Sequence, residues 1–141
     1  MTKSRYAVRA LIDLAKQPRG EAISLPIIAK RQRIKPTYLE QILFRLRQAK
    51  LIKGKKGPGG GFFLARDPKE IKLKDILDAV GETTAPVRCL LGKPDKYCAH
   101  VAPCPMQECW FELREEMDSF FNKYTLYDMC RRTKKAKFKK E

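Results

Sequence analysis

Apolar residues in the first part of the chain recur with helical spacing and predict three short helices. The first is expected over residues 5–17, and the second begins after Ser24 and ends near Arg33. The third is expected to begin at Pro36, a residue that suits the first turn of a helix. Its apolar positions at i, i+3, i+4 and i+7 are Leu39, Ile42, Leu43 and Leu46, and its other face carries Thr37, Tyr38, Glu40, Gln41, Arg45 and Gln48. A tight turn between the second and third helices indicates a helix-turn-helix.

Two short apolar runs follow, at residues 51–53 and 62–64, and predict a pair of strands. The glycine-rich segment between them, residues 54–61, is incompatible with a helix and therefore predicts a hairpin. The expected fold is mainly α with a small β-hairpin wing, which is a winged helix-turn-helix. In this fold the third helix reads base edges in the major groove, while the lysines of the hairpin suit phosphates or the minor groove beside it.

The second half of the chain predicts further helices around an irregular loop. A fourth helix is expected over residues 72–80, ended by Gly81, whereas residues 82–104 have no regular period and contain several prolines. From Pro105 onward, a long helix has apolar residues at the alternating steps of four and three that are typical of a coiled-coil seam. These residues are Met106, Trp110, Leu113, Met117, Phe120 and Tyr124. We expect the seam to form a homodimer interface, the alternative being that it packs on its own domain. Thr125 and Asp128 have the spacing of a capping box that opens a short last helix.

The expected organisation therefore has four parts. Residues 1–81 form the winged helix-turn-helix domain, and residues 82–104 form a cysteine-containing sensor loop. Residues 105–130 form the dimerisation helix and the short last helix, and residues 131–141 form a basic, disordered tail.

Charge is unevenly distributed along the 141 residues, whose formal net charge is +15. Residues 1–61 contain fifteen basic and three acidic side chains, whereas residues 62–130 contain nine and twelve. A folded segment this basic attracts polyanions, with nucleic acid favoured over an anionic membrane surface. The chain has no apolar run long enough to span a bilayer and no secretory signal, so the expected location is the cytoplasm and no membrane partner is expected. One histidine and three serines leave little from which to build a hydrolase, so an enzyme is not expected.

Five cysteines in such a chain indicate reduced thiols or metal ligands. Cys89, Cys98 and Cys104 lack the paired spacing of structural zinc sites, but three thiolates on one loop can hold an iron–sulfur cluster. Metal-free, reduced cysteines are the alternative. Cys130 is expected to be structural or incidental.

Several motifs occur together in one order along the chain. They are RYAVRA at residues 5–10, YLEQ at 38–41, GPGGGF at 57–62, LARD at 64–67, Cys104 followed by Trp110, and Thr125-Leu126. This ordered set resembles the bacterial winged-helix iron–sulfur regulators, sometimes called the Rrf-two family. That family includes the iron–sulfur cluster regulator, the nitric-oxide-sensing repressor and the cysteine-metabolism repressor.

The resemblance implies a homodimeric transcription regulator that binds double-stranded DNA at two half-sites. Thr37, Glu40 and Gln41 match positions that read bases, and Lys56 stands in the wing where a family member uses arginine. Lysine keeps the charge but lacks the planar guanidinium fork, which weakens a minor-groove preference. The remaining candidate DNA-binding residues are Arg5, Lys35 and Arg45 as phosphate anchors, together with Gly59 and Gly60 of the wing.

The resemblance also assigns an iron–sulfur cluster, of [2Fe-2S] or [4Fe-4S] type, to Cys89, Cys98 and Cys104. Gln107 stands where one family member has a histidine ligand, so the fourth ligand stays open among Cys109, Glu108, His100, a residue of the other subunit and a small molecule. One function is then a regulator gated by a cluster that senses redox state, iron or nitric oxide. The alternative is a cluster-free dimeric repressor controlled by a partner protein or a metabolite. An RNA-binding protein is a third class, and the wing motif argues against it.

Overall fold

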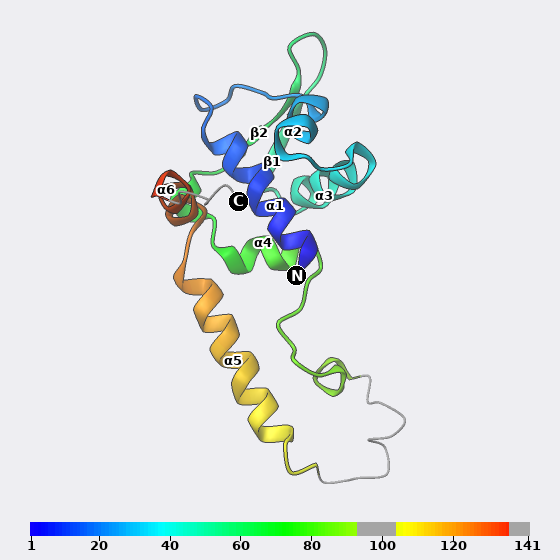
Figure 1. Cartoon of the computed structure of the whole chain (residues 1–141), viewed down its shortest axis with the longest axis vertical. Helices are drawn as coiled ribbons and strands as arrows, with labels where there is room; N and C mark the ends of the chain where they lie inside the picture. The colour runs from blue at the N-terminus through cyan, green and yellow to red at the C-terminus, as the bar shows by residue number, and fades with distance from the viewer. Residues whose placement is uncertain (93–103, 136–141) are drawn as a thin grey trace, which may run out of the picture.

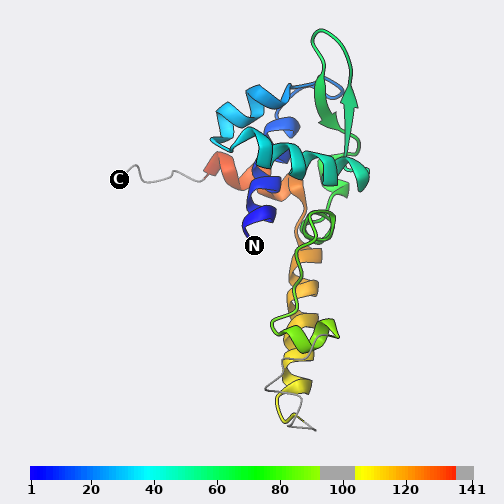
Figure 2. The ribbon, with the colours of Figure 1, turned by 90° about the vertical axis from the view of Figure 1, so that its right-hand side faces the viewer.

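The computed structural model describes residues 1–92 and 104–135. A compact body contains the first four α-helices, the hairpin and the last helix, and a long helix over residues 107–123 projects away from it (Figures 1 and 2). The expected fold class, a mainly helical winged helix-turn-helix with a hairpin, is confirmed. Within the described ranges, no helix is both long enough and apolar enough to cross a membrane.

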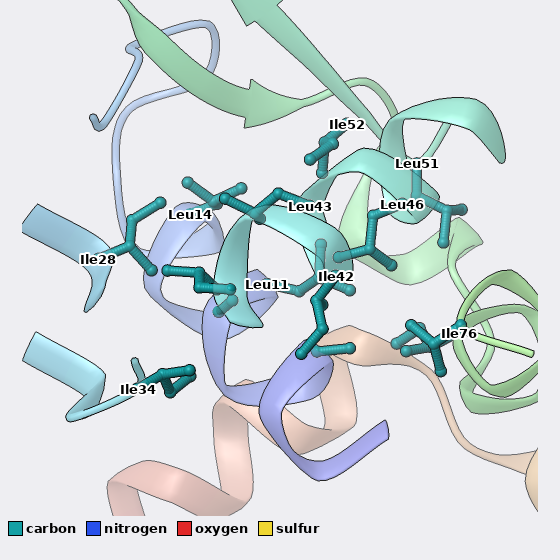
Figure 3. Close-up of a cluster of buried hydrophobic side chains, with 14 of the residues drawn as sticks. Leu11, Leu14, Ile28, Ile34, Ile42, Leu43, Leu46, Leu51, Ile52 and Ile76 are labelled. Atoms are coloured by element: carbon teal, nitrogen blue, oxygen red, sulfur yellow. The ribbon is translucent and has the colours of Figure 1, made fainter. Parts of the chain in front are cut away.

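Three helices form the core of the body: α1 Thr2–Ala15, α2 Leu25–Gln32 and α3 Pro36–Gln48. Their apolar faces meet in the buried cluster of Figure 3, in which Leu11, Leu43 and Leu46 are fully buried. The predicted stripe of α3 is entirely buried, because it is the face that packs on α1 and α2. Burial of this apolar surface supplies the main driving force for the fold.

The turn between α2 and α3 determines where the third helix begins. Arg33 adopts a left-handed conformation with φ 53°, and Ile34 donates its backbone N–H to the carbonyl of Ala29 at 3.0 Å. The Ile34 side chain is buried in the core, which anchors the turn. Pro36 then occupies the first turn of α3, as expected.

A polar contact fixes α2 against α1. The buried carboxylate of Asp13 accepts hydrogen bonds from Arg31 at 3.0 Å and from Gln32 at 3.2 Å. Because a buried carboxylate must be hydrogen-bonded, these contacts restrict how the two helices pack. The orientation of α2 in turn positions the helix that follows it.

The wing is an antiparallel hairpin of β1 Ile52–Lys55 and β2 Gly61–Leu64. Ile23 extends this pairing through two backbone hydrogen bonds with Phe62, at 2.9 and 2.8 Å. Gly61 has φ +147°, and a Cβ atom at this position would lie 2.1 Å from the Ile23 carbonyl oxygen. Glycine is therefore required where the hairpin meets the helical body.

The C-terminal elements return the chain to the body. After η1 Pro68–Glu70, α4 Leu73–Ala79 and η2 Arg88–Leu91, helix α5 Gln107–Lys123 runs back to α6 Leu126–Lys135. The fully buried Leu126 donates its backbone N–H to Ile71 at 2.8 Å. The expected capping box is confirmed, because Thr125 donates to Asp128 at 2.9 Å and Asp128 donates back to the Thr125 hydroxyl at 3.3 Å.

Two boundaries differ from the expectation by three residues or more. Helix α1 begins at Thr2 rather than at residue 5, because a distant carboxylate caps its first turn. Helix α6 continues to Lys135, so residues 131–135 of the expected tail are helical, and residues 136–141 lie outside the described residues.

Candidate nucleic-acid interface and cysteine loop

Helix α3 presents a polar face directly opposite its buried stripe. Thr37, Glu40 and Gln41, the expected base-reading residues, are all exposed there. They line a shallow groove together with Phe44, Arg45, Gln48, Asp78, Ala79 and Gly81. The ring of Tyr38 instead packs edge-on against Tyr6 at 5.7 Å, so Tyr38 belongs partly to the core.

The three candidate phosphate anchors are all exposed, but one of them already makes a hydrogen bond within the protein. Arg5 and Lys35 are exposed, at the start of α1 and just before α3. Arg45 is also exposed, but its Nη1 donates to the Val80 carbonyl at 3.1 Å. Part of the Arg45 guanidinium therefore holds the C-terminal end of α4 against the third helix.

The wing projects beyond the body as a basic tip (Figure 1). Lys55, Lys56 and Gly59 are exposed, and Gly60 donates its backbone N–H to Gly57 at 2.9 Å. A Cβ atom on Gly60 would lie 2.3 Å from the Lys55 carbonyl oxygen, so this tight loop requires glycine. The loop holds the lysine side chains at the outer end of the hairpin.

The short segment 80–84 connects three helices to the beginning of the cysteine loop. Arg45 of α3 contacts Val80, and Glu82 accepts the backbone N–H groups of Lys3 and Ser4 at 3.0 and 3.2 Å. The Thr84 hydroxyl donates to Asp118 of α5. Segment 80–84 therefore contacts α3, the start of α1 and α5 within five residues.

Glu82 is largely buried, with 14% of its side chain exposed. Burial by itself raises its pKa, but the hydrogen bonds from the Ser4 hydroxyl, the Ser4 N–H and the Lys3 N–H outweigh that effect. The net pKa of Glu82 lies below its ordinary value of 4.5. The ionised carboxylate thus serves as the cap for α1, whose own N-cap residue provides no side-chain hydrogen bond.

Two of the three candidate cluster ligands are described. Cys89 lies half-buried in η2, and Cys104 is exposed in the turn before α5, where its carbonyl accepts the Gln107 N–H at 3.2 Å. Cys98 lies outside the described residues, as does His100. Among the residues that are described, no group of three His, Cys, Asp or Glu side chains could hold a metal ion. The structure therefore leaves the cysteine trio as a prediction.

Other candidate ligands near the loop are also placed. Cys109 and Glu108 are exposed in the first turn of α5, and Cys104 precedes that helix instead of belonging to it. Cys130 is half-buried beside the core cluster.

The apolar residues of the predicted seam on helix α5 differ in their exposure to solvent. Met106, Leu113 and Phe120 are exposed, at 43%, 43% and 54%, whereas Trp110, Met117 and Tyr124 are half-buried. On the side facing its own chain, Arg114 Nη1 donates to the Leu90 carbonyl at 3.3 Å, and Asp118 accepts from Thr84. The exposed residues recur every seven positions, so they form one apolar line along the helix.

The model of the Rrf2 family, described as an iron-dependent transcriptional regulator, matches residues 1–132. The chain belongs to the Rrf2 family. Its relatives include an Azotobacter vinelandii protein named a putative HTH-type transcriptional regulator, ORF2, which is 35% identical over 132 residues. This match covers 94% of the present chain and 79% of the relative.

Two solved structures extend this family comparison. The T. potens IscR structure has a TM-score of 0.75 and 31% identity, covering 100% of this chain and 92% of that one. The global cysteine regulator CymR (YrzC) of B. subtilis has a TM-score of 0.71 and 30% identity, covering 92% and 94%. This Rrf2 protein is accordingly a DNA-binding transcriptional regulator of the IscR type and not an enzyme.

Three residues near the candidate interface of this Rrf2 protein were not predicted from the sequence. Phe44 is half-exposed on the polar face of α3, and its position seven residues after Thr37 is a spacing that could have revealed it. Arg47 lies beside Phe44, with the guanidinium carbon 5.9 Å from the ring centroid. Glu82 gave no local signal, because its partners are 78 and 79 residues away in the sequence.

Proposed function

We propose that this protein is a homodimeric, sequence-specific regulator of transcription, gated by an iron–sulfur cluster held by Cys89, Cys98 and Cys104. The observation that carries the DNA-reading part is the exposed polar face of α3, opposite a fully packed stripe and beside a projecting basic wing. Such a helix can enter the major groove without losing any contact of its own core.

The side chains of this surface have different roles in the proposal. Thr37, Glu40 and Gln41 read base edges, since hydroxyl, carboxylate and amide groups match the donors and acceptors in the major groove. Lys56 of the wing and the exposed cations Arg5 and Lys35 contact phosphates, with Arg45 contributing the part of its guanidinium not held by Val80.

Alanine substitutions test this division of roles. Thr37→Ala and Gln41→Ala should reduce discrimination among DNA sequences, whereas Lys56→Ala should weaken binding to all sequences and lower the salt slope by about one unit or less. Binding titrations at several salt concentrations measure both effects. Lys69→Ala, which removes a lysine of η1 outside the candidate interface, is the matched control. Uniform weakening by all three interface substitutions would contradict the proposed roles.

The residues around the cysteine loop fit an anionic cluster. Thiolates are the usual ligands of iron–sulfur clusters, and Cys89 and Cys104 both belong to the cysteine loop of residues 82–104. Arg114 lies next to this loop, and its Nε is buried with no hydrogen-bond partner among the described residues. A buried guanidinium nitrogen without a partner suits a neighbouring anion. When bound, the cluster would supply sensitivity to oxidation, iron or nitric oxide.

Gating requires that the loop affect the reading helix, and segment 80–84 supports such a connection. It includes the first three residues of the loop and contacts α3 through Arg45, α1 through Glu82 and α5 through Thr84. A change in the loop can alter DNA affinity only if these contacts differ between the cluster-bound and cluster-free states.

The spectrum of protein purified without oxygen tests the cluster. We expect visible absorption, with iron and acid-labile sulfide, that is lost in Cys104→Ala and retained in the control Cys130→Ala. Colour retained in Cys104→Ala would contradict the ligand assignment. Colourless, iron-free protein after reconstitution would contradict cluster gating and leave the DNA-reading role unaffected.

A cluster-free dimeric repressor, controlled by a partner protein or a metabolite, is the second candidate. The observation that favours it is the structural similarity to the cysteine regulator of B. subtilis, together with Gln107 at the position of an expected histidine ligand. The same spectrum decides between the two candidates.

A further inference from the structure

Phe44 occupies an unusual position on helix α3. Half of its side chain is exposed, although the four apolar residues of the predicted stripe on the same helix are all buried. At 3.6 residues per turn, positions 37, 41, 44 and 48 lie along one line on the side opposite that stripe. The Phe44 ring therefore lies in the same row as Thr37 and Gln41, the two residues proposed to read bases.

The surroundings of the ring are polar and include charged side chains of both signs. Phe44 lines the same shallow groove as Gln41 and Arg45, and the guanidinium of Arg47 lies over its ring at 5.9 Å. Arg47 also approaches the wing, since a Cβ atom on Gly54 would lie 3.7 Å from its Nη1. The ring is thus a large apolar group in a mainly polar groove, next to an arginine that approaches the hairpin.

An apolar ring that enters the major groove can make a favourable contact with few of the groups that the bases present there. The base edges present hydrogen-bond donors and acceptors, together with a single apolar group, the C5-methyl of thymine. Against any other base edge the ring would remove water from a polar group without replacing its hydrogen bond, which is unfavourable. The ring therefore favours thymine over the other bases.

We propose that Phe44 is a specificity-determining residue that contacts a thymine C5-methyl group and selects thymine at one position of each half-site. This inference rests on the proposed reading role of α3. It assigns to Phe44 an apolar contact that the carboxylate of Glu40 and the amide of Gln41 on the same face cannot make.

The test compares thymine with deoxyuridine, which lacks only the methyl group. A preferred duplex is first selected from a random DNA library with the full-length protein, and each thymine is then replaced in turn by deoxyuridine. Wild-type protein should lose about fourfold in affinity at one position per half-site, the effect of one buried methyl group. Replacement elsewhere should leave affinity unchanged.

Protein variants assign this effect to Phe44. Phe44→Ser should bind the thymine and deoxyuridine duplexes equally, while Phe44→Leu, which keeps an apolar side chain, should retain the preference for thymine. Ile27→Ser is the matched control, because Ile27 is 46% exposed on α2, and it should discriminate as the wild type does. Equal far-ultraviolet circular dichroism of all variants checks folding.

These experiments distinguish a failure of the inference about Phe44 from a failure of the proposed base-reading role of α3. If no thymine is sensitive to replacement, or if Phe44→Ser still discriminates, the inference about Phe44 is wrong while base reading by α3 stands. If the wild type selects no sequence, or if Thr37→Ala and Gln41→Ala leave the selected sequence unchanged, the reading role of α3 itself is wrong.

Discussion

Glu82 illustrates how a single residue can join parts of the chain that are far apart in sequence. Its carboxylate accepts backbone N–H groups in the first turn of α1, a role that a neighbouring Ser, Thr, Asp or Asn usually performs. It belongs to the segment that leads into the cysteine loop, so the start of α1 and that segment are held together. The bond depends on an ionised carboxylate and is therefore sensitive to pH.

We expect Glu82→Ala to lower the free energy of unfolding at neutral pH by about 1 kcal/mol, the usual cost of losing a helix cap. The folded-state pKa of Glu82 is lowered, so its stabilisation is fully present above the ordinary pKa of 4.5 and is lost as pH falls through the folded pKa. The difference between wild type and variant should therefore shrink in acid. Urea denaturation at equal protein concentration across this range measures it.

Glu21→Ala is the matched control, because Glu21 is exposed in the loop before α2. It should be nearly as stable as the wild type at every pH. A Glu82→Ala deficit that stays constant into acid would show that the carboxylate charge is not responsible.

Among the secondary-structure elements, the wing depends most closely on its contact with the helical body. Ile23 pairs with Phe62 through two backbone hydrogen bonds, and the absence of a side chain on Gly61 permits this approach. The hairpin has only two strands, and an isolated hairpin is marginally stable in water. The Ile23 pairing therefore holds the basic tip in place relative to α3.

Gly61→Ala should destabilise the protein by about 1–3 kcal/mol, because the new Cβ atom would lie 2.1 Å from the Ile23 carbonyl oxygen in a backbone conformation that alanine rarely adopts. Displacement of the wing should also weaken DNA binding. Thermal denaturation and DNA titration measure the two effects.

Gly54→Ala, in the opposite strand, is the control for this substitution. Its new Cβ atom would meet nothing closer than 3.7 Å, so both stability and binding should change little. Equal destabilisation by the two alanines would mean that the Gly61 contact with Ile23 is unimportant.

The wing and the start of α5 lie at opposite ends of the long axis of the protein (Figures 1 and 2). Helix α5 leaves the body with Met106, Leu113 and Phe120 exposed in one line. A second copy that covers this line would join two winged domains, as the proposed two-half-site binding requires. The cysteine loop approaches the same helix through Leu90 and Arg114.

We expect Leu113→Glu to convert the proposed dimer into a monomer of 16.3 kDa, because a buried carboxylate without a partner would destabilise the interface. Sedimentation velocity measures the mass. The control is Asn122→Glu, an exposed position on the opposite side of α5, which should remain dimeric. A dimer that persists in Leu113→Glu would place the interface elsewhere.

Much of the fold was predictable from local patterns. The stripe of α3, the strand pair and the Thr125–Asp128 capping box all depend on spacings within one element, and the structure confirms each of them. Among the candidate site residues, the exposure of Thr37 and Gln41 followed from the same periodicity. Phe44 was overlooked because an apolar residue is normally assigned to the core, although its position on the helix placed it outside.

Local patterns specify which segments become helices and strands, because helical periodicity, turn residues and caps act over a few neighbouring positions. Which distant groups meet depends on the packing of the folded chain: Glu82 at the start of α1, Arg45 at Val80, and Ile23 beside Gly61. These contacts join residues far apart along the chain, so no local pattern specifies them. They form when burial of the shared core brings the elements together, and the remaining backbone donors and carboxylates then find their partners.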